Sequence, residues 1–80
     1  MRTSEETWRV GNPMELGRAL ARARRKRGLT QQQLAARLYM QRSYLARMEA
    51  GLATDQVKRT FAVLRELGFE LAVTEQTGGR

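Results

Sequence analysis

Apolar residues recur with a helical period along most of this 80-residue chain. The clearest helix start is at Asn12, Pro13 and Glu15, because an N-cap type residue, a proline at the first helical position and a nearby acid are typical of a helix N-terminus. Apolar positions then repeat every three or four residues until a basic turn and Gly28. The pattern therefore predicts a helix over residues 13–27.

Two shorter helical segments follow. Thr30 can cap the first of them, with Gln33 three residues later to complete a capping box. Its predicted inward positions are Leu34, Ala35 and Leu38. Tyr39 and Met40 interrupt the pattern, which resumes from about residue 42 to 50 and ends at Gly51. We expect two short helices joined by a tight turn.

A fourth helix is predicted between Thr54, an N-cap type residue, and Gly68. Its apolar positions, which repeat at three and four residues, are Val57, Phe61, Leu64 and Leu67. Beyond Gly68 the period changes to two, which is typical of a half-buried strand. The residues that share the apolar face of this strand are Phe69, Leu71 and Val73.

This strand needs a partner, because a single strand cannot satisfy its own backbone hydrogen bonds. Residues 1–11 are polar apart from Trp8 and Val10, and this stretch is either a frayed arm or a short edge strand that could be the mate. The same strand of a second molecule is the other candidate. We favour the second molecule.

Charge narrows the classes of function. The chain has 15 Lys and Arg against 8 Asp and Glu, and the net charge of +7 favours a polyanionic partner, either nucleic acid or an anionic membrane. It has no cysteine and no histidine, which excludes disulfides, zinc fingers and the usual general base. The carboxylates are scattered, so we expect no enzyme, metal or cofactor. No signal peptide or membrane span is evident, and we expect a cytoplasmic protein.

The spacing between residues 31 and 48 carries a family resemblance. The positions in register are Gln31, Leu34, Ala35, Leu38, Met40, Leu45 and Met48. This pattern resembles the helix-turn-helix of the Xre and phage repressor or Cro family over roughly residues 16–68. The resemblance implies a mainly α fold, a lambda-repressor-like bundle of about four helices with one C-terminal strand that pairs across a dimer. The family usually has glycine at the position of Tyr39, and a positive φ there would cost a tyrosine about 1 kcal/mol.

The outward face of the third helix is polar and basic, as a helix that enters the major groove of double-stranded DNA requires. Arginine can bind guanine through two hydrogen bonds, and residues at the helix N-terminus reach base edges first. By resemblance, the base-reading positions are Arg42, Ser43 and Arg47. Gln31 occupies the position that holds a phosphate, and Gln41 and Tyr44 are further base or phosphate candidates. The alternative for each is an ordinary solvated residue.

Arg24 lies on the apolar side of the first helix, because it follows Leu16 and Leu20 at intervals of four. Glu49 stands four residues after Leu45 on the inward side of the third helix. We predict a partly buried, structural ion pair between Arg24 and Glu49, and the family resemblance places such a pair at these positions. Other basic residues are either phosphate contacts or solvated charges: Arg25, Lys26, Lys58 and Arg59.

The fourth helix and the strand that follows it at once are similar to the ending of HipB-type antitoxins, in which the C-terminal strands of two protomers pair. This resemblance implies a homodimer that represses its own operon at a palindromic operator and binds a HipA-like serine/threonine kinase toxin. The dimer interface would comprise Phe69, Leu71 and Val73. A free-standing Xre-family regulator and a protein-interaction module without DNA binding are the alternatives, and a membrane-surface peptide fits less well. The predicted regions are an N-terminal arm (1–11), a helix-turn-helix domain (12–68), a dimerisation strand (69–76) and a flexible tail (77–80).

Overall fold

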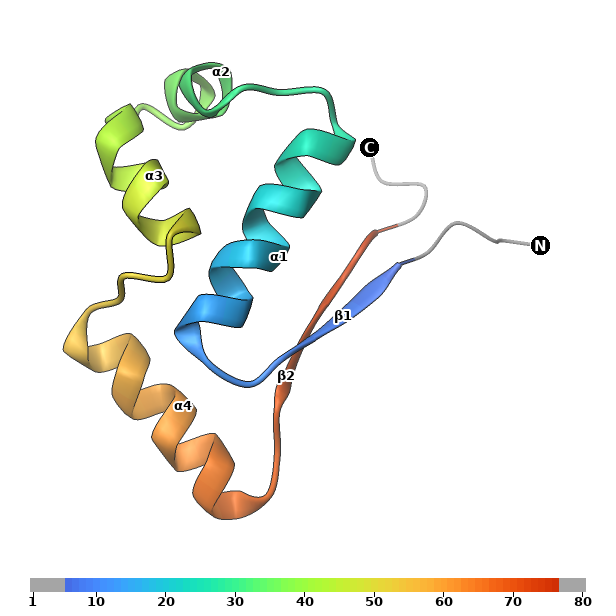
Figure 1. Ribbon diagram of the computed structural model, residues 1–80, viewed down its shortest axis with the longest axis vertical. Coiled ribbons are helices and arrows are strands. Elements are labelled where there is room, and N and C mark those ends of the chain that lie inside the picture. Colours follow the sequence, from blue (N-terminus) through green and yellow to red (C-terminus); the bar gives the residue numbers. More distant parts are fainter. Residues whose placement is uncertain (1–5, 77–80) are drawn as a thin grey trace.

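The computed structural model describes residues 6–76, and within them the chain forms four helices and a small two-stranded sheet (Figure 1). The elements in chain order are β1 (Thr7–Val10), α1 (Pro13–Lys26), α2 (Gln31–Arg37), α3 (Arg42–Glu49), α4 (Asp55–Leu67) and β2 (Leu71–Thr74). This architecture confirms the mainly α, four-helix part of the predicted fold. The predicted tail, residues 77–80, lies outside the described residues.

The helices begin where the capping residues predict. Asn12 Oδ1 accepts a hydrogen bond from the Glu15 amide at 2.8 Å, and α1 starts directly after Asn12. The Glu15 carboxylate accepts from the Gly11 amide at 2.6 Å. At α2 the capping box is complete: the Thr30 hydroxyl accepts from the Gln33 amide at 3.0 Å, and the Gln33 side chain accepts from the Thr30 amide at 2.9 Å. These local bonds satisfy amides that have no partner within the helix.

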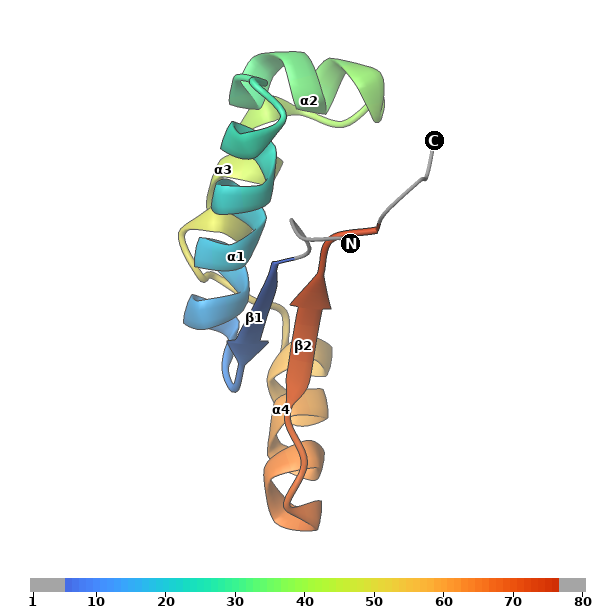
Figure 2. The same cartoon turned by 90° about the vertical axis from the view of Figure 1, so that its right-hand side faces the viewer.

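The strand β2 pairs with β1 of the same chain, in antiparallel register, with Trp8 opposite Val73 and Val10 opposite Leu71 (Figure 2). The stretch around Trp8 and Val10 is therefore the mate of β2 in this structure, in place of the same strand of a second molecule that the sequence pattern favoured. The physical reason is proximity, because β1 belongs to the same chain and reaches β2 at a high effective concentration. The sheet has the order β1–β2, so the outer edge of β2 carries no strand within residues 6–76.

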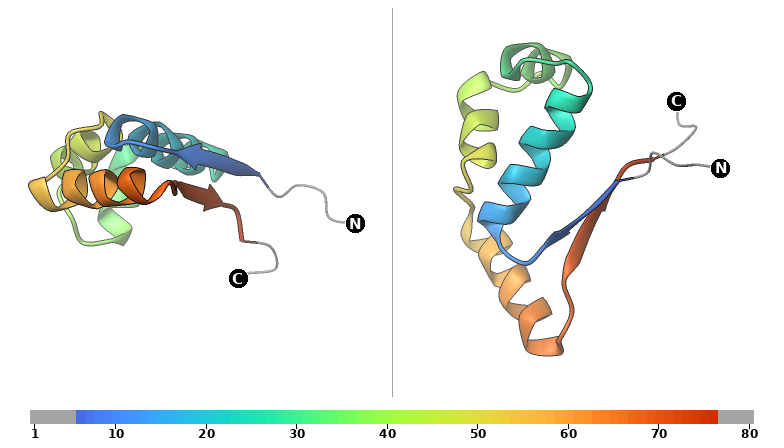
Figure 3. Two further views of the ribbon diagram at one scale, coloured as in Figure 1. Left: turned by 90° about the horizontal axis from the view of Figure 1, so that it is seen from below. Right: turned by 45° about the vertical axis from the view of Figure 1, so that its right-hand side comes forward.

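The core lies between the sheet, α1 and the first part of α4. Val10, Ala19 and Phe61 form its buried centre, and Trp8 and Val73 pack against it together with further apolar side chains. The sheet contacts α1 on the side opposite α3 (Figures 1 and 3). The molecule measures 38 × 35 × 16 Å, so the core is thin. A chain of this size buries a limited fraction of its apolar surface.

Two predicted inward positions are exposed instead. Leu38 is 53% exposed, because α2 ends at Arg37 and Leu38 is its C-cap residue, beyond the last helical turn. Leu67 is 63% exposed, because the end of α4 extends past the other helices (Figure 1). In both cases the last apolar residue of the periodic pattern lies at the end of its helix, where no neighbouring element covers its side chain.

Gly17 lets α1 and α3 approach closely. A Cβ atom added at Gly17 would lie 2.6 Å from the carbonyl oxygens of both Met48 and Glu49, at the end of α3. Real Cβ atoms do not come so near to backbone oxygens, so any side chain here would push the two helices apart. A glycine inside a helix usually costs about 1 kcal/mol relative to alanine, and here it provides the close contact that seats α3 on α1.

Candidate nucleic-acid interface

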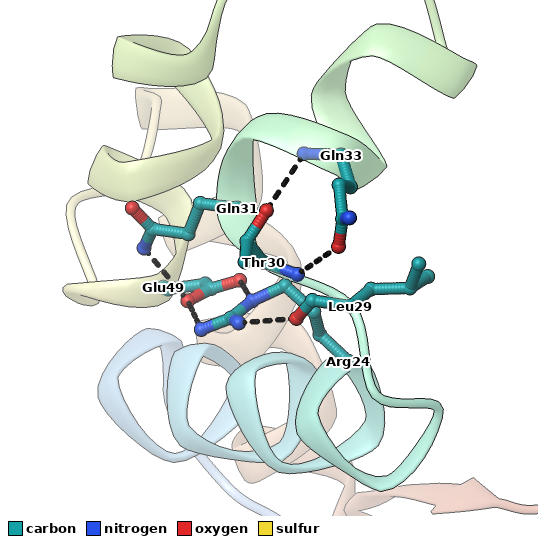
Figure 4. Close-up of polar contacts among 6 residues, drawn as sticks. All are labelled: Arg24, Leu29, Thr30, Gln31, Gln33 and Glu49. Carbon is teal, nitrogen blue, oxygen red and sulfur yellow. Dashed lines mark hydrogen bonds and ion pairs between the residues drawn. The ribbon is translucent and has the colours of Figure 1, made fainter.

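A bidentate ion pair between Arg24 and Glu49 joins α1 to the end of α3 (Figure 4). Arg24 Nε donates to Glu49 Oε2 at 2.7 Å, and Arg24 Nη2 donates to Glu49 Oε1 at 2.9 Å. The two side chains are only 11% and 6% exposed. The two parallel bonds between guanidinium and carboxylate fix orientation as well as distance.

The loop before α2 and the first residue of α2 join the same network. Arg24 Nη1 donates to the Leu29 carbonyl oxygen at 2.8 Å, and Gln31 Nε2 donates to Glu49 Oε1 at 2.9 Å (Figure 4). The four groups of this network are the Arg24 guanidinium, the Glu49 carboxylate, the Leu29 carbonyl and the Gln31 amide, and each would otherwise need a separate partner in a low-dielectric environment. The network therefore fixes α3 relative to both preceding helices.

Electrostatics keep this pair charged. Hydrogen bonds from Arg24 and Gln31 lower the pKa of the Glu49 carboxyl, against the opposing effect of burial. The hydrogen bond to Glu49 raises the pKa of Arg24 above its ordinary value. Neither group is poised to exchange a proton near neutral pH, so this pair has a structural role.

The turn between α2 and α3 contains a tyrosine with left-handed backbone geometry. Tyr39 has φ 55°, and among residues 6–76 it is the only residue other than glycine with a positive φ. Its amide donates to the Ala36 carbonyl at 3.2 Å, and the Met40 amide donates to the Ala35 carbonyl at 3.0 Å. These two bonds form a Schellman motif, in which glycine is the usual residue at the left-handed position. The turn typical of a helix-turn-helix is thus kept despite the tyrosine.

The exposed surface of α3 carries most of the predicted DNA-binding residues. Arg42, Ser43, Tyr44 and Arg47 are exposed, whereas Leu45 is buried. Gln41 is the N-cap residue of α3 and is also exposed; its side chain makes no capping hydrogen bond and is available for another partner. Residues 41–47 therefore come together in one turn and helix.

Two predicted phosphate contacts have other partners in the structure. The Gln31 side-chain nitrogen binds Glu49, so a phosphate would have to use its second amide hydrogen or the backbone. Lys26 Nζ lies 2.8 Å from Glu75 Oε1, a contact that raises the pKa of Lys26 and lowers that of Glu75. Arg27 also contacts Glu75, at 3.0 Å. Local sequence signals could not have predicted this contact of Lys26 and Arg27 with Glu75, because Glu75 follows β2 and is distant from α1 along the chain.

One further feature lies beside the exposed helix. Tyr44 and Arg47 border a mostly apolar groove of about 350 Å³ between α1, α3 and the start of α4, which Leu16, Leu52 and Val57 also line. The stems of these two side chains thus have an apolar surface to rest on while their polar ends face solvent. The groove lies beside α3, and the exposed polar surface of α3 remains accessible to solvent.

The helices α2 and α3 form a helix-turn-helix unit. They are joined by a tight turn in which Tyr39 has left-handed backbone geometry. The buried ion pair of Arg24 and Glu49 lies behind them, and the basic surface of α3 faces outward. The chain belongs to the helix-turn-helix domain family, since a family model described as "Helix-turn-helix domain" matches residues 15–75. This family suggests a DNA-binding regulator and is typically non-enzymatic. Comparisons with curated proteins and with solved structures gave no match. Within residues 6–76, the helices are too short or too polar to cross a membrane.

Proposed function

We propose that this protein is a sequence-specific transcriptional repressor that binds a palindromic operator as a homodimer. The observation that carries the proposal is the exposed surface of α3, where Arg42, Ser43 and Arg47 face solvent while the Arg24–Glu49 pair holds the helix from behind. Arginine can donate two hydrogen bonds to guanine, and a serine hydroxyl can bind several bases. The net charge of +7 adds attraction to the phosphates.

Base recognition requires that α3 enters the groove in one orientation. The close contact at Gly17 and the hydrogen bonds of Arg24 and Gln31 to Glu49 restrain the end of α3 at three points. A helix held in this way loses little conformational freedom on binding, which favours affinity and specificity. This rigidity supports DNA recognition over a flexible, nonspecific polyanion contact.

Fluorescence anisotropy tests this proposal directly. We expect the protein to bind the duplex upstream of its own gene more tightly than a scrambled duplex of equal length and composition. The logarithm of the association constant should fall linearly with the logarithm of salt concentration, because bound phosphates release counterions. Equal affinity for the two duplexes would reject sequence-specific recognition, and no binding would favour the protein-interaction module.

A second copy of the chain is the partner that best covers the apolar surface around the end of α4. Val63, Leu67 and Phe69 are 57%, 63% and 69% exposed, and Leu71 is 39% exposed. Val73, the third strand residue proposed for the interface, packs against the core of its own chain. Exposed large apolar side chains so close in sequence are typical of an interaction surface. Two copies would also present two α3 helices to two half-sites.

Placing a charge on this surface should disrupt the dimer. Both Leu67→Asp and Phe69→Asp put a carboxylate at an exposed position, so they should spare the protomer fold. In a two-fold symmetric interface each substitution occurs twice, and we expect dimer affinity to fall about 100-fold or more. Sedimentation velocity over a concentration series measures this, with Leu52→Asp, also exposed but away from α4's end, as the control. Unchanged dimers in both variants would exclude this surface.

We further propose that the regulator is the antitoxin of a HipBA-like operon that restrains a HipA-like serine/threonine kinase. The support is the resemblance of the chain's ending, α4 followed by β2, to the HipB-type antitoxins. A gene for such a kinase directly beside this gene is expected. Its absence would favour a free-standing regulator of the same family.

A further inference from the structure

At position 39 the fold would be better served by glycine than by tyrosine. The Tyr39 amide donates to the Ala36 carbonyl, and the next amide, that of Met40, donates to the Ala35 carbonyl, so that the two bonds close α2. The left-handed backbone conformation of Tyr39 is free of steric cost only for glycine. The side chain is 98% exposed, so it adds almost no packing to compensate. Backbone strain of this kind is concentrated at functional sites, so the exposed Tyr39 side chain is a candidate for a binding role.

The position of Tyr39 indicates what kind of partner its side chain would bind. The turn is at the outer corner of the molecule, far from α4 and the sheet (Figure 1). It joins α2 directly to α3, and the exposed cations Arg37 and Arg42 stand on its two sides. A turn that carries an exposed aromatic side chain and is followed and preceded along the chain by exposed arginines suits a polyanion better than an apolar protein surface.

We propose that Tyr39 binds the DNA sugar-phosphate backbone beside the groove that α3 enters. The phenol hydroxyl donates a hydrogen bond to a phosphate oxygen, and the ring packs against the adjacent sugar. Tyrosine is among the side chains that donate to phosphates, and such contacts position a protein without reading sequence. This inference rests on the proposed DNA-binding function and adds to it a residue outside the base-reading set.

Two substitutions separate the strain from the contact. Tyr39→Gly should raise the midpoint of thermal unfolding, because the left-handed turn becomes unstrained. It should weaken binding about five-fold, by a similar factor for the upstream duplex and the scrambled duplex. The salt dependence should keep its slope, because a neutral phenol displaces no counterion. Tyr39→Phe should leave the unfolding midpoint unchanged and weaken binding by a smaller factor, since only the hydroxyl is lost.

Anisotropy titrations and thermal unfolding of the three proteins decide among the outcomes. If Tyr39→Gly binds both duplexes as tightly as the parent, the inference is overturned, and the ring is then free for a protein partner. If the loss is confined to the upstream duplex, Tyr39 contacts bases and the backbone contact is wrong. If the parent protein itself binds no duplex, the proposed function fails, and this inference fails with it.

Discussion

Replacing Arg24 with alanine is expected to lower the free energy of unfolding by about 3–5 kcal/mol, because a buried carboxylate loses its counter-ion. Glu49, only 6% exposed, would keep the Gln31 amide as its remaining side-chain hydrogen bond, and the Leu29 carbonyl would lose its donor. A small domain has about 5–15 kcal/mol of stability in total, so this variant should be largely unfolded at moderate urea concentrations. Urea titration followed by circular dichroism measures the change.

Two controls distinguish burial from simple loss of charge. Arg25→Ala removes the same charge from the next, exposed position and should change the unfolding free energy by less than about 0.5 kcal/mol. Replacing both members of the pair, Arg24→Met with Glu49→Leu, should cost less unfolding free energy than the separate variants Arg24→Ala and Glu49→Ala added together, because neither charge is left alone. An Arg24→Ala variant as stable as the parent would contradict the role of this pair.

The acid dependence of stability provides an independent measure of the same pair. Hydrogen bonding to Arg24 lowers the pKa of Glu49 in the folded protein below its ordinary value of 4.5. The stability contributed by this ionisation is therefore fully present above about pH 4.5 and is lost as the pH falls through the folded pKa. Glu49→Gln should lose stability at neutral pH and show a flatter decline below pH 4.5 than the parent.

Removing Arg42 or Arg47 is expected to reduce affinity for the upstream duplex about 10- to 100-fold, the range that corresponds to one bidentate contact with guanine. Both side chains are exposed on α3, and Arg42 stands at its first turn, where base edges are reached first. Affinity for a scrambled duplex should fall much less. Anisotropy with both duplexes at one salt concentration gives the specificity ratio of each variant.

Arg9→Ala is the matched control for this experiment. It removes one positive charge from β1, on the far side of α1 from α3 (Figure 1), where Arg9 lies 3.3 Å from Glu70. We expect its affinity for either duplex to stay within about three-fold of the parent, because screened charges that far from the groove contribute little. If all three variants lost affinity equally on both duplexes, net charge alone would account for binding, and base reading by α3 would be rejected.

Features that depend on neighbours along the chain could be predicted from the sequence. Local signals include the caps at Asn12 and Thr30, the glycine after α4 and the period-two strand. The helices α1, α2 and α4 each begin or end directly beside one of these residues. The inward placement of Arg24 and Glu49 also followed from spacing alone, because residues four apart share one face of a helix. The left-handed turn at Tyr39 was indicated only through the family resemblance.

Other features depend on which segments meet in space, and only the tertiary structure decided them. The partner of β2 is β1, although both candidate mates satisfied the same backbone requirement in the sequence. The bond from Gln31 to Glu49 and the contact of Lys26 with Glu75 join residues far apart in the chain. The exposure of Leu67 reflects where α4 passes the end of α1. Periodicity shows which face of an element is apolar, but packing decides what covers that face.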